Sequence, residues 1–201
     1  MNLRGAITIV ALLLSGAGVL WAGTDGLQVL TAEGARRLTI EEKPKPLPVV
    51  LLRDQRGEAF RLQDFEGSNL LVEFIYTRCV TLCTSLGVTF EQVNRELPKN
   101  ALGNKVNMVS ISFDPRDSTS DLSDYGDRFD AVPDHWRIAR VENADELKLL
   151  LDTFGITVIP DQWGNFEHNA AVHFVDQNGY LNRIVDHDPA TRTLETLWKR
   201  L

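Results

Sequence analysis

Apolar and polar positions in the middle of the chain predict a buried strand followed by a helix. Residues 70–76 are rich in β-branched and aromatic side chains, which is typical of a strand buried on both faces. From Leu82 to Leu97, apolar residues recur at helical spacing until Pro98 interrupts them. The strand is therefore predicted to end near Thr77, and a short junction separates it from the helix.

The rest of the chain continues this alternation of strands and helices. Strands are predicted at residues 105–113 and 136–141, helices at 118–129, 144–154 and 189–201, and hairpins around turns at 54–57 and 177–179. Asn143 suits the N-cap of its helix, and Gly155 suits its C-terminal end. This order predicts one α/β domain, with an N-terminal hairpin and a sheet flanked by helices on both faces.

The N-terminus carries an export or anchoring signal. Residues 6–23 are almost wholly apolar and follow the basic residue Arg4. Their length lies at the lower edge of what a membrane span needs, and Trp21 interrupts the place where a cleavage site is expected. We expect an uncleaved inner-membrane anchor with the domain in the periplasm. The alternative is a cleaved signal and a soluble periplasmic protein.

These segments divide the chain into three parts. Residues 1–24 are the signal or anchor, residues 25–47 are a linker, and residues 48–201 are the domain. Prolines between residues 43 and 48 favour an extended end to the linker. The net charge of −7 comes without a basic stripe, which excludes nucleic acid as an expected partner.

The only two cysteines, Cys79 and Cys83, flank the strand-to-helix junction. On a helix, this spacing places the two Cβ atoms about 5–6 Å apart on one face. A relaxed disulfide needs about 3.5–4.5 Å, so the spacing favours two thiolates on one metal ion. A strained, easily reduced disulfide stays open, as does the structural disulfide that is common outside the cytosol, although so short a loop gains little stability from a bridge.

Three motifs together resemble the Sco (SenC-type) copper chaperones. They are Phe-Ile-Tyr-Thr-Arg-Cys at residues 74–79 with Cys83, Ile-Ser-Phe-Asp-Pro-Arg-Asp at residues 111–117, and His168 before Phe-Val-Asp-Gln-Asn-Gly at residues 174–179. The resemblance covers residues 48–201 and implies a thioredoxin-like fold. It implies that Cys79, Cys83 and His168 bind copper for the binuclear copper centre of cytochrome c oxidase. Family members often carry proline after each cysteine, where this chain has Val80 and Thr84.

Four histidines compete to be the third ligand. His168, which is predicted to lie in a loop just before a strand, is favoured mainly by its match to the family motif, and Glu167 beside it is a candidate to tune the imidazole. His173, five residues further on, is predicted to point to the opposite face of the strand as a structural residue. His135 is predicted to be a surface turn residue, and His187 lies between Asp186 and Asp188 near the last predicted helix.

The predicted function is that of a copper metallochaperone. Soft thiolates select Cu(I), and a site of two sulfurs and one nitrogen also tolerates Cu(II). The expected acceptor is the copper-bearing subunit of cytochrome c oxidase or another cuproprotein. Because the periplasm is oxidising, a thioredoxin-like reductant is an expected second partner.

Other functions remain open at this stage. Cys79 and Cys83 can instead be the redox pair of a thiol-disulfide oxidoreductase, although their spacing is one residue longer than Cys-x-x-Cys. Two cysteines, one histidine and a water also suit zinc. Residues 114–117 are interpreted as a helix-entry turn, with Asp117 or Ser118 as the cap, rather than as functional residues. The aromatic residues at 163 and 166 are expected to pack rather than to shield a metal.

Overall fold

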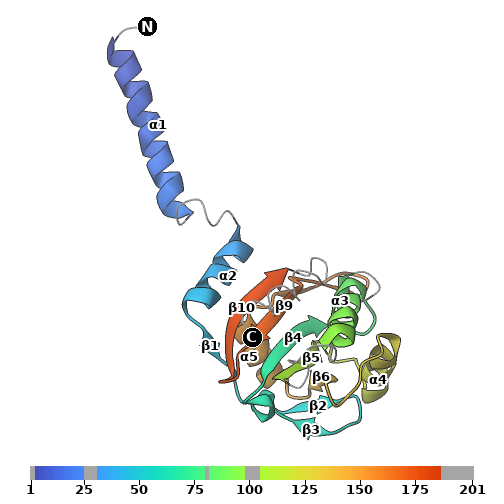
Figure 1. Ribbon diagram of the computed structural model, residues 1–201. Coiled ribbons are helices and arrows are strands. Elements are labelled where there is room, and N and C mark those ends of the chain that lie inside the picture. The colour runs from blue at the N-terminus through green and yellow to red at the C-terminus, as the bar shows by residue number, and fades with distance from the viewer. Residues whose placement is uncertain (1–2, 25–30, 80–81, 98–104, 187–201) are drawn as a thin grey trace. The chain divides into compact units, whose positions relative to one another are not determined.

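The computed structural model describes residues 3–24, 31–79, 82–97 and 105–186 (Figure 1). The chain divides into two compact units, Met1–Glu42 and Lys43–Leu201. The predicted helix at residues 189–201 lies outside the described residues.

The described residues of the N-terminal unit form two helices, α1 (Leu3–Gly23) and α2 (Ala32–Glu42). None of the helices in the described part of the chain has the length and apolar character that a membrane crossing requires. In α2, Glu33 forms ion pairs with Arg36 and Arg37 one turn further along the helix. The middle of the predicted linker is therefore a helix.

The second unit contains a mixed sheet of eight strands within the described residues. Its strands lie in the order β1-β10-β9-β4-β5-β6-β2-β3. The β4, β5 and β6 strands are parallel to one another, and β9 pairs antiparallel with β4. The strands are β1 (Lys45–Pro46), β2 (Leu52–Asp54), β3 (Ala59–Phe60), β4 (Asn69–Ile75), β5 (Val106–Ser112), β6 (Trp136–Val141), β9 (Ala171–Val175) and β10 (Tyr180–Asp186).

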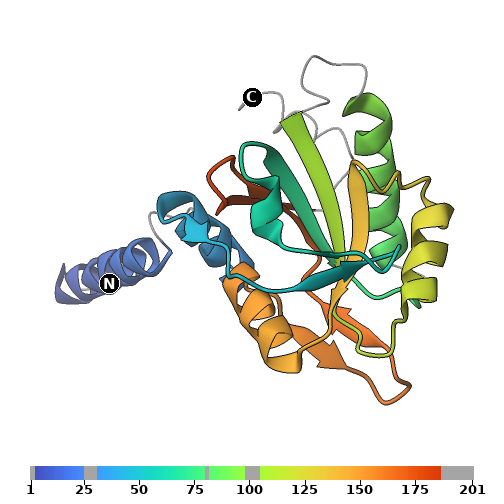
Figure 2. The ribbon, with the colours of Figure 1, turned by 90° about the horizontal axis from the view of Figure 1, so that it is seen from below.

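Helices cover both faces of this sheet, as predicted (Figure 2). On one face lie α3 (Leu82–Glu96) and α4 (Thr119–Arg128), and on the other lies α5 (Ala144–Phe154). Phe90 of α3 packs against Trp136 of β6, with ring centroids 5.7 Å apart. Phe154 of α5 packs against Phe74 of β4 at 5.1 Å, so the central strand is buried from both sides. A short 3-10 helix, η1 (Leu62–Phe65), precedes β4.

A second, two-stranded sheet was not predicted from the sequence. It consists of β7 (Val158–Pro160) and β8 (Phe166–His168), which pair antiparallel. The Asp161 carboxylate holds the connecting loop by accepting hydrogen bonds from the backbone N–H groups of Trp163 and Asn165. His168 therefore lies on a strand, and not in a loop before one. We refer to residues 158–168 as the β7–β8 hairpin.

Gly87 of α3 lies against the ring of Phe129, which is 3% exposed. A Cβ at position 87 would lie 2.5 Å from the Phe129 Cζ. We expect Gly87→Ala to lower the free energy of unfolding by about 1–2 kcal/mol, since overpacking costs more than alanine gains in helix propensity. Urea denaturation followed by circular dichroism measures this difference. Gly126→Ala is the control, because its Cβ would have 3.4 Å to the nearest atom, and an equal effect of both substitutions would contradict the packing argument.

Candidate functional site

Cys79 lies directly after the central strand, in the turn that leads to α3. Its backbone N–H donates to the Tyr76 carbonyl at 3.1 Å, which closes a four-residue turn at the end of β4. The Cys79 residue is buried, with 3% of its surface exposed. Cys83 lies in the first turn of α3, as predicted, but its side chain lies outside the described part of the structure, as do residues 80 and 81.

His168 lies at the same end of the sheet as Cys79. Its ring contacts Phe113, the residue after β5, with centroids 5.0 Å apart. Phe113 and Phe166 both pack against Tyr76, at 5.7 and 5.3 Å, and the Tyr76 hydroxyl donates to the Phe166 carbonyl at 3.4 Å. These aromatic contacts attach β8 to the end of β4, three residues before Cys79.

The predicted ligand set is only partly represented in the described structure. Cys79 and His168 come to one end of the sheet, while the side chain of Cys83 is not described. Among the described side chains, no group of three histidine, cysteine, aspartate or glutamate residues is placed to hold a metal ion. The three-ligand site therefore stays a prediction.

Two of the other histidines, and Glu167, have different surroundings from His168. His173 is completely buried in β9, where its Nδ1 lies 3.1 Å from the Val72 carbonyl oxygen and its ring packs against Phe154. His135 is exposed in a turn before β6, and Glu167 is exposed. Alternation along β8 places Glu167 and His168 on opposite faces. His187 lies outside the described residues.

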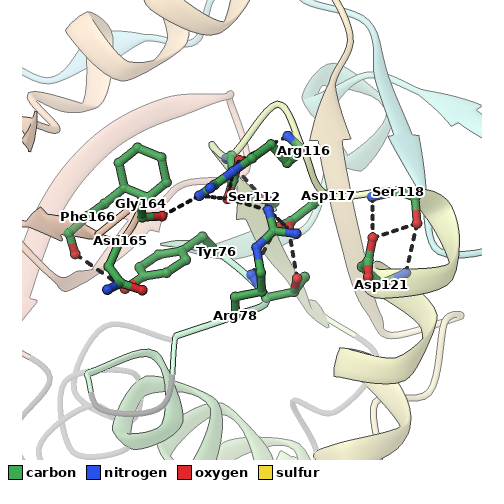
Figure 3. Close-up of polar contacts among 12 residues, drawn as sticks. Tyr76, Arg78, Ser112, Arg116, Asp117, Ser118, Asp121, Gly164, Asn165 and Phe166 are labelled. Atoms are coloured by element: carbon green, nitrogen blue, oxygen red, sulfur yellow. Dashed lines mark hydrogen bonds and ion pairs between the residues drawn. The ribbon is translucent and has the colours of Figure 1, made fainter. Parts of the chain in front are cut away.

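A buried cluster of charged and hydroxyl groups lies beside the cysteine turn (Figure 3). The Asp117 carboxylate accepts hydrogen bonds from the Thr77 N–H at 2.9 Å, the Thr77 hydroxyl at 2.8 Å and the Ser112 hydroxyl at 2.6 Å. Arg78, whose side chain is 45% exposed, lies 3.3 Å from the same carboxylate. Asp117 therefore fixes the two residues that immediately precede Cys79.

Asp114, also buried, is shared by two arginines. Its carboxylate accepts hydrogen bonds from Arg78 at 2.7 Å and from the Nε and Nη2 of Arg116 at 2.9 and 2.8 Å. Burial by itself would raise the pKa of Asp114, but the hydrogen bonds from Arg116 and Arg78 outweigh burial and lower that pKa to about 2. Asp114 is therefore ionised under physiological conditions, and two cations compensate it.

The prediction of a helix-entry turn at residues 114–117 with Asp117 or Ser118 as the cap is confirmed, because the Asp117 N–H donates to the Asp114 carbonyl at 3.1 Å and α4 follows with Ser118 as its cap. Ser118 caps α4, because its hydroxyl accepts from the Asp121 N–H, and the Asp121 carboxylate accepts from the Ser118 N–H. Asp117 does not cap the helix. Its carboxylate instead accepts hydrogen bonds from the N–H and the hydroxyl of Thr77.

A second buried carboxyl lies on β4 itself. Glu73 is 0% exposed and accepts a hydrogen bond from the Ser110 hydroxyl of β5, which in turn accepts from the Trp136 indole N–H at 2.8 Å. The other carboxyl oxygen, Oε2, has no hydrogen-bond partner among the residues that the structure describes. Burial raises the pKa of Glu73 to about 8, with the Ser110 hydrogen bond opposing it. Glu73 is therefore a neutral acid in the core at neutral pH.

The family model described as SCO1/SenC matches residues 50–200 of the sequence. The chain belongs to the SCO1/SenC family. A comparison with curated proteins gave no match.

Solved structures of Sco proteins share the fold of this SCO1/SenC chain. A SCO1/SenC family lipoprotein from Bacillus anthracis str. Ames has a TM-score of 0.69 at 21% identity, covering 78% of this chain and 96% of that one. Bradyrhizobium japonicum ScoI with copper bound has a TM-score of 0.65 at 23% identity, covering 78% and 99%. BsSco, described as a member of the Sco family of cytochrome c oxidase assembly proteins, has a TM-score of 0.67 at 18% identity, covering 78% and 93%. These likenesses establish the predicted thioredoxin-like α/β fold.

The arginines of the SCO1/SenC site were not predicted to matter. Arg78 and Arg116 belong to the motifs at residues 74–79 and 111–117, but nothing in the local pattern shows that both reach Asp114. One signal in the sequence could have indicated this cluster: Asp114 and Asp117 follow the carboxyl end of a predicted parallel strand, where the functional groups of α/β sheets are commonly located.

Proposed function

We propose that the protein is a copper metallochaperone that binds copper through Cys79, Cys83 and His168. Membership of the SCO1/SenC family supports this function, and B. japonicum ScoI was solved with copper bound. The observation that carries the proposal is the placement of His168 on a strand fixed by aromatic contacts to Tyr76 and Phe113, at the end of the sheet where Cys79 emerges.

The proposed donors suit copper as a cargo. Two thiolates favour Cu(I), and an added imidazole makes Cu(II) acceptable as well. Three protein ligands leave a coordination position open, so an acceptor can take the ion by stepwise ligand exchange. His168 comes from a separate two-stranded hairpin and can release the ion without disrupting β4.

The proposed acceptor is the copper-bearing subunit of cytochrome c oxidase or another cuproprotein. BsSco is described as belonging to a family of cytochrome c oxidase assembly proteins, which supports the first of these. An extracytoplasmic site next to the membrane, reached through the N-terminal segment, is part of the proposal, and the B. anthracis relative is a lipoprotein. A thioredoxin-like reductant would keep both thiols available for the metal.

Titration of the reduced, metal-free full-length protein with Cu(I) tests this function. We expect one copper ion per chain in competition with a chromophoric chelator, and loss of this binding in Cys79→Ser and Cys83→Ser. We expect His168→Ala to weaken the affinity by about a hundredfold, since it removes one of three ligands. His135→Ala is the matched control, because this histidine is exposed in a turn. Equal affinities of the two histidine variants would refute the three-ligand site.

A thiol-disulfide oxidoreductase is the second candidate function. Two cysteines at a strand-to-helix junction of a thioredoxin-like fold favour it, and BsSco is described as having a disulfide switch. Two measurements on the His168→Ala variant separate the two functions: its rate of reducing a disulfide-bonded cuproprotein, and its transfer of copper. An oxidoreductase retains its rate without this imidazole, whereas a chaperone loses copper transfer. Metal analysis of protein purified under reducing conditions separates copper from zinc.

A further inference from the structure

Arg116 connects two segments that are far apart in the sequence. Its guanidinium donates two hydrogen bonds to Asp114, from Nε and Nη2, and Nη2 also donates to the Gly164 carbonyl at 2.6 Å (Figure 3). Gly164 lies in the loop between β7 and β8. One side chain therefore joins the loop that follows β5 to the tip of the β7–β8 hairpin.

The same guanidinium also contacts the strand that carries His168. Its carbon lies 5.3 Å from the centre of the Phe166 ring, which is a favourable position for a cation over an aromatic face. Phe166 packs edge-on against Phe113 at 5.5 Å, and Phe113 contacts the His168 ring at 5.0 Å. Arg116 thus holds the hairpin at its loop and at the residue two positions before His168.

Asp114 extends this connection to the cysteine turn. It accepts a hydrogen bond from Arg78 at 2.7 Å, and Arg78 directly precedes Cys79. The turn that carries Cys79 and the hairpin that carries His168 are therefore attached to one buried carboxylate through two arginines. The planar guanidinium makes these contacts from one rigid fork, and the ammonium of lysine lacks that geometry.

We propose that Arg116 is a positioning residue that fixes the β7–β8 hairpin, and with it His168, against the cysteine turn. Its effect on copper rests on the proposed function, whereas its effect on the hairpin does not. Arg116 does not act as a ligand. Its guanidinium restricts the hairpin to the arrangement in which the His168 ring contacts Phe113.

Hydrogen exchange of the reduced, metal-free full-length protein tests the positioning directly. We expect Arg116→Gln to accelerate exchange of the amides that pair β7 with β8 by about tenfold, without changing the amides of β5. Arg116→Lys is expected to behave like Arg116→Gln, because lysine lacks the planar guanidinium fork although it keeps the positive charge. Unchanged exchange in Arg116→Gln, or full recovery in Arg116→Lys, would overturn the proposal.

Arg137→Gln is the matched control. Arg137 lies over the Phe60 ring at 4.7 Å and pairs with the buried Asp54 at 3.6 Å, so it makes the same kinds of contact in another part of the sheet. It is expected to leave hairpin exchange unchanged. The same acceleration in both variants would show a general loss of stability and overturn the role of Arg116.

A double-mutant cycle with His168→Ala tests the consequence for copper. We expect Arg116→Gln to weaken Cu(I) binding about tenfold when His168 is present, and to have no further effect in His168→Ala. Equal losses in both backgrounds would overturn positioning through His168. If the wild-type protein binds no copper, the proposed function fails, and the exchange measurement still decides whether Arg116 holds the hairpin.

Discussion

Replacing Glu73 by glutamine is expected to remove a large part of the pH dependence of stability. Burial raises the pKa of Glu73 from 4.5 to about 8 in the folded protein. The unfolded chain therefore ionises this group at lower pH than the folded chain does, and stability falls as the pH rises between these values. From about pH 5 to about pH 8 the wild-type protein should lose roughly 3–4 kcal/mol through this group, and Glu73→Gln should not.

Glutamine is a suitable replacement because it keeps the shape of the glutamate side chain and one hydrogen-bond-accepting oxygen. Its amide oxygen can accept the hydrogen bond from Ser110, which Trp136 supports. Urea unfolding of both proteins at several pH values gives the difference in free energy of unfolding. Glu58→Gln, at a side chain that is 57% exposed, is the control for loss of a carboxylate. Parallel pH profiles of the wild type and Glu73→Gln would mean that Glu73 ionises equally in the folded and unfolded chain.

The predicted elements that proved correct are those defined by local signals. Asn143 accepts from the N–H groups of residues 145 and 146, and Gly155 adopts a positive φ of 67°, so α5 begins and ends as expected. The β6 strand covers the predicted residues, and β4 is buried along almost its whole length. These features depend on residues that are close together in the sequence.

The features that were missed depend on contacts between distant residues. The β7–β8 hairpin is short, carries Pro160 and exposes most of β7, so its sequence lacks the alternation that marks a half-buried strand. Tyr76 and Phe113, which directly follow β4 and β5, contact Phe166 of its second strand. No local pattern predicts these contacts.

The candidate site shows the same limit. The apolar patterns of residues 70–76 and 82–97 predicted that Cys79 and Cys83 flank the strand-to-helix junction, because these signals are local. His168 was selected from its match to a family motif, since spacing along the chain says nothing of its distance from the sulfurs. The roles of Asp114 and Asp117 could not be predicted without the fold, because Arg78 and Thr77, which bind them, follow the distant strand β4.

Asp117→Ala is expected to destabilise the domain more than any surface substitution. The carboxylate is completely buried and accepts three hydrogen bonds, two from Thr77 and one from Ser112. Alanine would leave the Thr77 N–H buried without this acceptor. Arg78 would keep its ion pair with Asp114 and lose the one with Asp117. We expect the free energy of unfolding to fall by about 3–5 kcal/mol, the range found when one member of a buried charge network is removed. Urea denaturation followed by circular dichroism measures this loss.

Asp152→Ala and Asp117→Asn are the control variants for the stability lost in Asp117→Ala. Asp152 pairs with Lys148 on the surface of α5, where both side chains are mostly exposed, so its loss should cost less than about 1 kcal/mol. Asparagine at position 117 keeps one oxygen acceptor and should recover part of the stability. If Asp117→Ala costs no more than Asp152→Ala, the hydrogen bonds to Thr77 do not fix the turn. Cys79 would then owe its position to the Tyr76 turn and the aromatic contacts alone.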